Sequence, residues 1–186
     1  YFLIITPLVP SNKSEISIDS LMSVLPKAKD DTNKVNLLCS LSTNFYKINP
    51  DSGIKYAHLA ISLSDQIGWN RGKAKAYNSL GVNSSIKSHN EEAVVYFKKS
   101  LDIYKQLDFV EGVSQQLGNL GIVSMNLSNF TAALDYYQQA LKIAEKDGIQ
   151  SSIARQNGNI GIVYTYLKDY NKALKYYRKS LELTEK

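Results

Sequence analysis

Apolar residues recur every three or four positions through most of the chain, and this spacing predicts helices rather than strands. In residues 113–146 two such stripes are separated by a short polar turn. We therefore expect a pair of helices in this stretch. The first stripe is Leu117, Leu120, Gly121 and Met125, and the second is Ala133, Leu134, Tyr137, Ala140, Leu141 and Ala144.

The same pair of stripes returns at an offset of forty residues, so the chain is a repeat. The most visible marks are Leu80-Gly81, Leu120-Gly121 and Ile160-Gly161, each followed by Ala93, Ala133 or Ala173. A fainter copy precedes them. We expect an array over residues 34–186, with units at 34–72, 73–112, 113–152 and 153–186.

Polar residues between the stripes predict where the helices begin. Asn49-Pro50-Asp51, Asn90-Glu91-Glu92 and Ser128-Asn129 supply the side chains that cap helix starts. Upstream, residues 16–33 predict a short amphipathic helix that stops near Pro26 and a lead-in to the array. We expect that helix to cover the first unit.

The repeated residues resemble those of the tetratricopeptide repeat family, in a long variety found in sensor domains of bacterial signalling proteins. The period is forty instead of the usual 34, and Lys105 and Glu145 stand where that family has a helix-ending proline. The resemblance implies an all-α fold, a right-handed α-solenoid or superhelix of stacked antiparallel helix pairs. The matching residues are Tyr77, Leu80-Gly81, Ala93, Phe97 and Ser100; Leu117, Leu120-Gly121, Ala133, Tyr137 and Ala140; and Asn157, Ile160-Gly161, Ala173, Tyr177 and Ser180.

The resemblance also implies where a ligand binds, because this family uses the first helix of each unit to line a concave face. Asparagine side chains there can pair with the backbone of an extended peptide, and Lys75 and Arg155 can anchor a carboxylate. Alternatively, the amides bond only to neighbouring helices or to water. The expected peptide-binding residues are Lys75, Asn78, Val82, Gln115, Asn119, Ile122, Arg155, Asn159 and Ile162.

Composition weighs against several other kinds of site. The 22 Lys and Arg against 17 Asp and Glu give a net charge of +5, without the arginine density of a nucleic-acid reader. Cys39, the only cysteine, is expected in the core, and His58 and His89 lack metal-ligand spacing. We therefore expect no metal, no cofactor, no bound nucleic acid and no catalysis.

These features predict a non-catalytic module that binds a protein or an extended peptide segment. We expect the sensor or docking region of a larger bacterial signal-transduction protein, such as a histidine kinase, a cyclase or a transcription regulator. One alternative is a self-associating scaffold that dimerises through residues 170–186 or through the N-terminal apolar tail. The other is a cytoplasmic adaptor or peptide receptor.

Residues 1–15 form the apolar tail, which is too short to span a bilayer. It is expected to be either an extended tail or the remnant of an export signal. The signal interpretation favours the exported side of a membrane over the cytoplasm.

Overall fold

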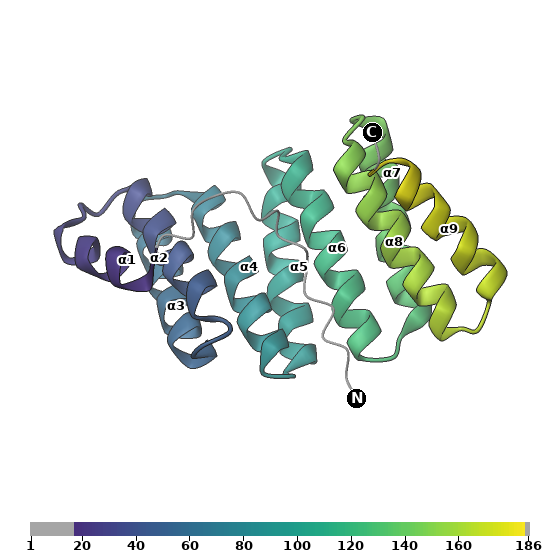
Figure 1. Cartoon of the computed structure of the whole chain (residues 1–186). Helices are drawn as coiled ribbons and strands as arrows, with labels where there is room; N and C mark the ends of the chain where they lie inside the picture. Colours follow the sequence, from purple (N-terminus) through teal and green to yellow (C-terminus); the bar gives the residue numbers. More distant parts are fainter. Residues whose placement is uncertain (1–16, 185–186) are drawn as a thin grey trace.

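The computed structural model describes residues 17–184, and their helices follow one another along a single curved row (Figure 1). Every regular element within this range is helical, which confirms the all-α solenoid. The elements are α1 (Ile18–Val24), the 3-10 turn η1 (Leu25–Lys27), α2 (Thr32–Phe45), α3 (Pro50–Gln66), α4 (Asn70–Ile86), α5 (Asn90–Gln106), α6 (Val110–Asn126), α7 (Phe130–Lys146), α8 (Gln150–Tyr166) and α9 (Tyr170–Glu182).

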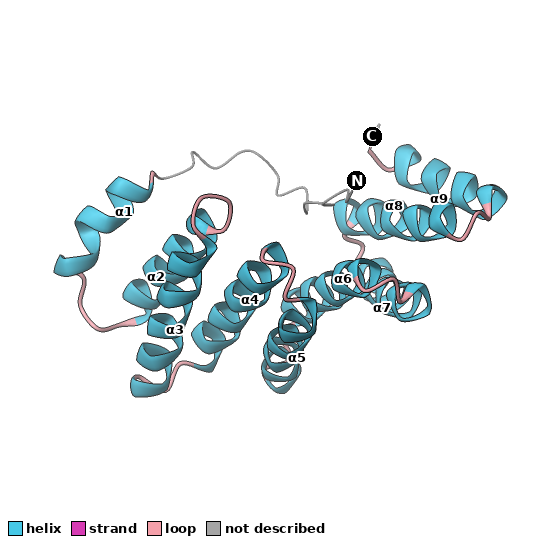
Figure 2. Cartoon of the chain, turned by 90° about the horizontal axis from the view of Figure 1, so that it is seen from below, coloured by secondary structure: helices cyan, strands magenta, loops and turns pink. Residues whose placement is uncertain are grey.

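The row bends into an arc when it is seen along its helices (Figure 2). Helices α2, α4, α6 and α8 lie on the inner side of the arc, and α3, α5 and α7 lie on the outer side. Each helix packs against the next one in sequence, and α2 also contacts α4 directly. We call the surface carried by α2, α4, α6 and α8 the inner face.

Close contacts between a glycine and an aromatic ring join the two helices of a unit. A β-carbon on Gly81 would lie 2.6 Å from Cδ1 of Phe97, and one on Gly161 would lie 2.7 Å from Cδ1 of Tyr177. Gly121 faces the ring of Tyr137 in the same way. As the repeat pattern predicts, glycine at this position lets the ring reach the backbone of the inner helix.

The apolar core consists of clusters that are each shared by three consecutive helices. Phe97 of α5, Leu120 of α6 and Ala140 of α7 meet in one cluster. Tyr137 of α7 and Ile160 of α8 meet in the next, together with Met125 of α6. No helix pair buries its own apolar surface alone, so the units stabilise one another by stacking.

The turns from α3 to α9 share one conformation and recur every twenty residues. Each contains a residue with positive φ: Gly68, Ser88, Asp108, Ser128, Gly148 and Lys168. The amide of the following residue donates a hydrogen bond to the carbonyl oxygen five residues back, as from His89 to Ser84 at 2.9 Å. This pairing satisfies the last carbonyls of each helix. The backbone conformation therefore repeats every twenty residues, whereas the residue pattern repeats every forty.

Two of the three expected helix starts are capped as predicted. The Oδ1 atoms of Asn49 and Asn129 accept hydrogen bonds from the amides of Ser52 and Ala132, both at 3.1 Å. The prediction for Asn90 is wrong, because Asn90 is already the first residue of α5 and its N-cap is His89. The three-residue turn with its positive-φ residue sets that boundary.

Helix α1 lies against α2 and places Leu21 in a buried position. It ends at Val24 and continues as the 3-10 turn that contains Pro26, close to the expected stop. The apolar tail at residues 1–15, with the homodimer contact proposed for it, lies outside the described residues.

Candidate functional site

The nine residues expected to bind a peptide lie on three helices of the inner side, α4, α6 and α8. Each of the nine keeps part of its surface accessible to solvent. The structure therefore places them together on the inner face. Their availability to a ligand depends on the hydrogen-bond partners of their polar atoms.

A hydrogen bond between two of the predicted asparagines crosses from α6 to α4. The Nδ2 atom of Asn119 donates to Oδ1 of Asn78 at 2.8 Å. Among the described residues, Nδ2 of Asn78 and Oδ1 of Asn119 have no hydrogen-bond partner. One bond thus orients both amides and leaves a donor and an acceptor for another molecule.

The third asparagine does not continue this row. Asn159 donates instead to Oε1 of Gln156 on its own helix, at 3.4 Å. Gly118 takes the place on α6 that Asn78 has on α4, so α6 offers no side chain for Asn159 to reach. The asparagine row therefore spans α4 and α6 only.

Two glutamines support this surface and were missed by the sequence reasoning. Gln116 and Gln156 are fully buried, and their Oε1 atoms accept from Asn119 and Asn159. Their Nε2 atoms have no partner within the described part of the chain. A Gln three residues before Asn in two successive units is the sequence signal that could have revealed them.

The two cationic residues on either side of the asparagine row, Lys75 and Arg155, differ in their interaction partners. The Nζ atom of Lys75 donates to Oδ1 of Asn36 on α2 at 2.8 Å and lies 5.7 Å from the centre of the Trp69 ring. Arg155 donates to Ser152 at 3.3 Å. Burial lowers the pKa of the Arg155 guanidinium, which stays charged at neutral pH.

The three predicted aliphatic residues are only half available to a ligand. Val82 packs against the cluster that contains Phe97, and Ile122 and Ile162 pack against the cluster that contains Tyr137. All three have intermediate exposure. Their role in the core accounts for their apolar character without a ligand, so the amides and cations are the side chains most available to a ligand.

Two shallow depressions of the described surface lie elsewhere. One, of about 370 Å³, is lined by Trp69, Arg71, Leu107 and Phe109, where the guanidinium of Arg71 stacks 4.1 Å above the Phe109 ring. The other, of about 270 Å³, lies between the α5–α6 turn and the end of α7. None of the nine predicted residues lines either one.

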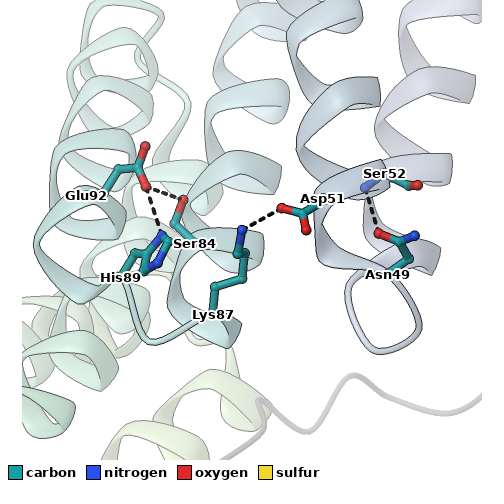
Figure 3. A network of polar contacts seen from close by, with 7 residues as sticks. All are labelled: Asn49, Asp51, Ser52, Ser84, Lys87, His89 and Glu92. Carbon is teal, nitrogen blue, oxygen red and sulfur yellow. Dashed lines mark hydrogen bonds and ion pairs between the residues drawn. The ribbon is translucent and has the colours of Figure 1, made fainter.

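A polar network near the α4–α5 turn contains the residue types of a hydrolase but not their order (Figure 3). Nδ1 of His89 lies 3.6 Å from Oε2 of Glu92, which accepts a hydrogen bond from the Ser84 hydroxyl at 3.3 Å. However, the carboxylate lies between the serine and the histidine, so the imidazole cannot take the serine proton. Lys87 of the same turn pairs with Asp51 of α3 and ties two units together.

The described residues hold no group of three or more His, Cys, Asp or Glu side chains that could bind a metal. No described helix has the length and apolar content that a membrane span requires.

The helix pairs repeat every forty residues, and in each of three units a glycine on one helix contacts an aromatic ring on the other. A comparison with protein families agrees with this pattern. Residues 115–186 match the tetratricopeptide repeat family. This part of the chain, which covers α6 to α9, is therefore similar in sequence to tetratricopeptide repeats. The repeats support a protein-binding module, and no catalytic family is indicated.

Solved structures share the fold of this chain at low sequence identity. BtubC from P. vanneervenii aligns with a TM-score of 0.74 and 19% identity over 90% of this chain and 70% of its own. A Rap protein complexed with Competence and Sporulation Factor gives 0.82 and 19% over 90% of this chain and 48% of its own. A STAND protein with a tetratricopeptide repeat sensor, from Pyrococcus horikoshii, gives 0.79 and 22% over 89% and 26%.

The chain thus spans less than half the length of two of these three proteins. No curated protein matches it by sequence.

Proposed function

We propose that the inner face binds an extended peptide segment, and that the chain is the sensor or docking region of a larger bacterial signal-transduction protein. The Rap protein and the STAND protein, which share the fold, support this placement: the first was solved with Competence and Sporulation Factor, and the second carries its repeats as a sensor. The proposed binding residues are the nine residues of α4, α6 and α8 described above.

The hydrogen bond between Asn119 and Asn78 is the observation that carries the proposal. It fixes two half-exposed amides and leaves one donor and one acceptor without a partner in the described chain. An extended backbone offers a carbonyl oxygen and an N–H group to such a pair, whatever its side chains. Binding of the backbone would therefore supply affinity without dictating sequence.

Charge adds a preference to this backbone recognition. Lys75 on α4 and Arg155 on α8 lie on either side of the asparagine row, and the nine residues include no carboxylate. A guanidinium binds a carboxylate through two parallel hydrogen bonds, whereas an ammonium acts as a point charge. We expect the ligand to carry an acidic side chain or its terminal carboxylate near Arg155.

A peptide selection tests the proposal. A displayed library of random peptides, selected on the purified chain, supplies probes whose affinities are then measured by calorimetry. Replacing both Asn119 and Asn159 by Ala should weaken binding, because each lost hydrogen bond is worth about 0.5–1.5 kcal/mol. Gln138→Ala is the matched control, since Gln138 is an exposed amide on the outer helix α7.

The control variant should bind the selected peptides as the natural chain does, and both proteins should melt alike. Equal affinities for the asparagine variant and the natural chain would refute the assignment of the inner face. Failure to select any peptide would refute peptide binding itself.

Self-association is a second candidate, because apolar side chains of α9, Leu174 and Leu181 among them, are exposed. Light scattering at several protein concentrations separates the two functions. A mass that stays that of the monomer removes the scaffold, whereas a mass that rises with concentration supports it.

A further inference from the structure

A shallow hollow of about 370 Å³ lies between the α3–α4 turn and the α5–α6 turn. The two turns are forty residues apart and occupy equivalent places in successive units, so the hollow connects neighbouring units along one edge of the row. None of the nine inner-face residues lines it. Its lining consists of Gly68, Trp69, Asn70, Arg71, Leu107 and Phe109.

Arg71 is the only charged residue in this lining. Its Cζ atom lies 4.1 Å from the centre of the Phe109 ring. Within residues 17–184 its guanidinium forms neither an ion pair nor a hydrogen bond. Stacking on a ring occupies the face of a guanidinium and leaves the N–H groups at its edge for a carboxylate.

Acidic residues on the surrounding elements do not neutralise Arg71. Asp65, near the end of α3, pairs instead with Lys73 at 2.6 Å. Asp108 and Glu111 flank Phe109 in the sequence, yet neither lines the hollow. An anion that enters the hollow therefore meets a guanidinium whose hydrogen-bonding groups are unoccupied within the described chain.

Two aromatic rings and a leucine give the hollow an apolar wall. Leu107 is 41% exposed, and Trp69 and Phe109 each keep part of their surface exposed. Both rings are fixed by local packing, because a β-carbon on Gly72 would overlap the Trp69 ring and one on Gly112 would overlap the Phe109 ring. The wall is therefore in place before a ligand arrives.

The lining thus combines one free cation with an apolar wall. We propose that the hollow binds the C-terminal residue of a partner polypeptide, with the terminal carboxylate on Arg71 and an apolar side chain against Trp69 and Leu107. In a C-terminal residue the carboxylate and the side chain are attached to the same carbon atom, so one residue contacts both. An internal Asp or Glu would need a second residue to fill the apolar wall.

The shape of the hollow favours a chain end over a free organic acid. Pockets for small molecules enclose most of the surface of their ligand, whereas this hollow is shallow and open to solvent. The rest of a polypeptide can lie over the neighbouring surface, where the side chain of Val110 is 45% exposed. Contacts outside the hollow then add to the affinity.

Trp69 is the only tryptophan of the chain, so its fluorescence reports on this hollow. The probes are N-acetylated pentapeptides of glycine and serine that end in leucine, with either a free C-terminal carboxylate or an amide. Fluorescence titration of the full chain is paired with calorimetry. We expect the free carboxylate to bind at least roughly tenfold more tightly, the effect of a hydrogen bond to a charged group. A carboxylate peptide ending in serine should bind roughly fivefold more weakly than the leucine peptide.

Two matched pairs of variants separate the charge from the apolar wall. Arg71→Gln should remove the preference for the carboxylate, whereas Arg178→Gln, at an exposed arginine of α9, should keep it. Leu107→Ser should weaken binding of the leucine peptide. Leu127→Ser, at the end of α6 and 39% exposed, should not. Circular dichroism melting confirms that each variant folds.

Lys75 is the competing cation, because its Nζ atom lies 5.7 Å from the centre of the Trp69 ring. Lys75→Gln should leave the preference for the carboxylate unchanged. Loss of that preference in Lys75→Gln but not in Arg71→Gln would place the carboxylate on the inner face and overturn the proposal.

Other results would overturn it as well. They are equal binding of the carboxylate and amide peptides, a titration with neither a fluorescence change nor heat, and an amidated peptide with an internal Asp that binds as tightly as the free carboxylate. The variant with Asn119 and Asn159 replaced by Ala should bind the leucine peptide normally. A failure at this hollow therefore remains distinct from a failure of peptide binding at the inner face.

Discussion

The ring of Tyr137 lies directly on the backbone of Gly121, where a β-carbon would come within 2.6 Å of Cδ1 and 2.7 Å of Cζ. The ring is almost completely buried, and burial raises the pKa of its hydroxyl. The ring also packs against Ile160 and Val163 of α8, which limits its movement away from Gly121. The contact explains why a glycine stands in the middle of a helix.

Replacing this glycine should weaken the fold. Gly121→Ala gains helix propensity but forces the added methyl group into the Tyr137 ring. Overpacking of this kind costs about 1–3 kcal/mol, more than the propensity gain. We expect the free energy of unfolding in urea to fall accordingly.

Gly118→Ala is the matched control, because it lies one turn earlier on the same helix. Its β-carbon would lie 3.5 Å from Nε2 of Gln156, an ordinary contact. That variant should keep or raise the stability, by up to about 1 kcal/mol. Tyr137→Leu should reduce the cost of Gly121→Ala in a double-mutant cycle. Additive effects in the cycle would show that the ring is not the cause.

The repeated turn predicts a second set of stability changes. Ser88 and Ser128 have φ values of 62° and 57°, a left-handed conformation that glycine adopts without the clash of a β-carbon. Ser88→Gly and Ser128→Gly should therefore each raise the free energy of unfolding, by roughly 1 kcal/mol. Urea denaturation measures the gain.

Replacing a glycine that has a positive φ by alanine tests the same explanation in the opposite direction. Gly68 and Gly148 have φ of 68°, and a β-carbon on either would touch nothing within 4 Å. Their replacement by Ala should nonetheless destabilise the protein, since the cost is in the backbone. Ser62→Gly, at an exposed position inside α3, should also destabilise, by about 1 kcal/mol. A loss of stability in Ser88→Gly would contradict the assigned turn conformation.

The thiol of Cys39 should be unreactive in the folded protein. Burial raises its pKa from the ordinary 9.0 to about 12, although the charge of Lys75 opposes the shift. At pH 8 the folded chain should then carry roughly a thousandth of the thiolate of the unfolded chain. A colorimetric thiol reagent, added with and without urea, measures the difference in rate.

The same shift predicts how stability depends on pH. The unfolded thiol ionises near pH 9 while the folded one stays protonated, so the unfolded state is favoured as pH rises from about 9 toward 12. Cys39→Ala removes this contribution and should lose less stability over that window. Combining Cys39→Ala with Ser40→Cys moves the thiol to an exposed neighbour, which should react quickly. Equally fast reaction of Cys39 in the folded chain would exclude its burial.

Much of the fold could be predicted because its contacts repeat with the sequence. Gly121 and Tyr137 belong to one unit, and the same separation joins Gly81 to Phe97 and Gly161 to Tyr177. A contact that occurs three times at the same spacing is visible when the sequence is aligned with itself at an offset of forty residues. The inner position of α4, α6 and α8 follows from the same register.

The hydrogen bonds of the inner face could not be predicted in this way. Asn119 bonds to Asn78 across 41 residues, so the two asparagines occupy different positions of their units. Asn159, at the position of Asn119, has no such partner because Gly118 stands opposite. The start of α5 was misplaced for a related reason: it depends on the φ of Ser88, which no residue type there signals.

The turns recur every twenty residues, and this spacing determines which insertions and deletions the fold can accommodate. Duplicating forty residues between two equivalent turns would lengthen the arc by one helix pair, and every glycine would still face an aromatic ring. Deleting twenty would also preserve each turn, yet it would join two helices of the same kind and set ring against ring or glycine against glycine. The backbone would tolerate either change, whereas the side chains permit only the first, so the protein can gain or lose length only in whole pairs of helices.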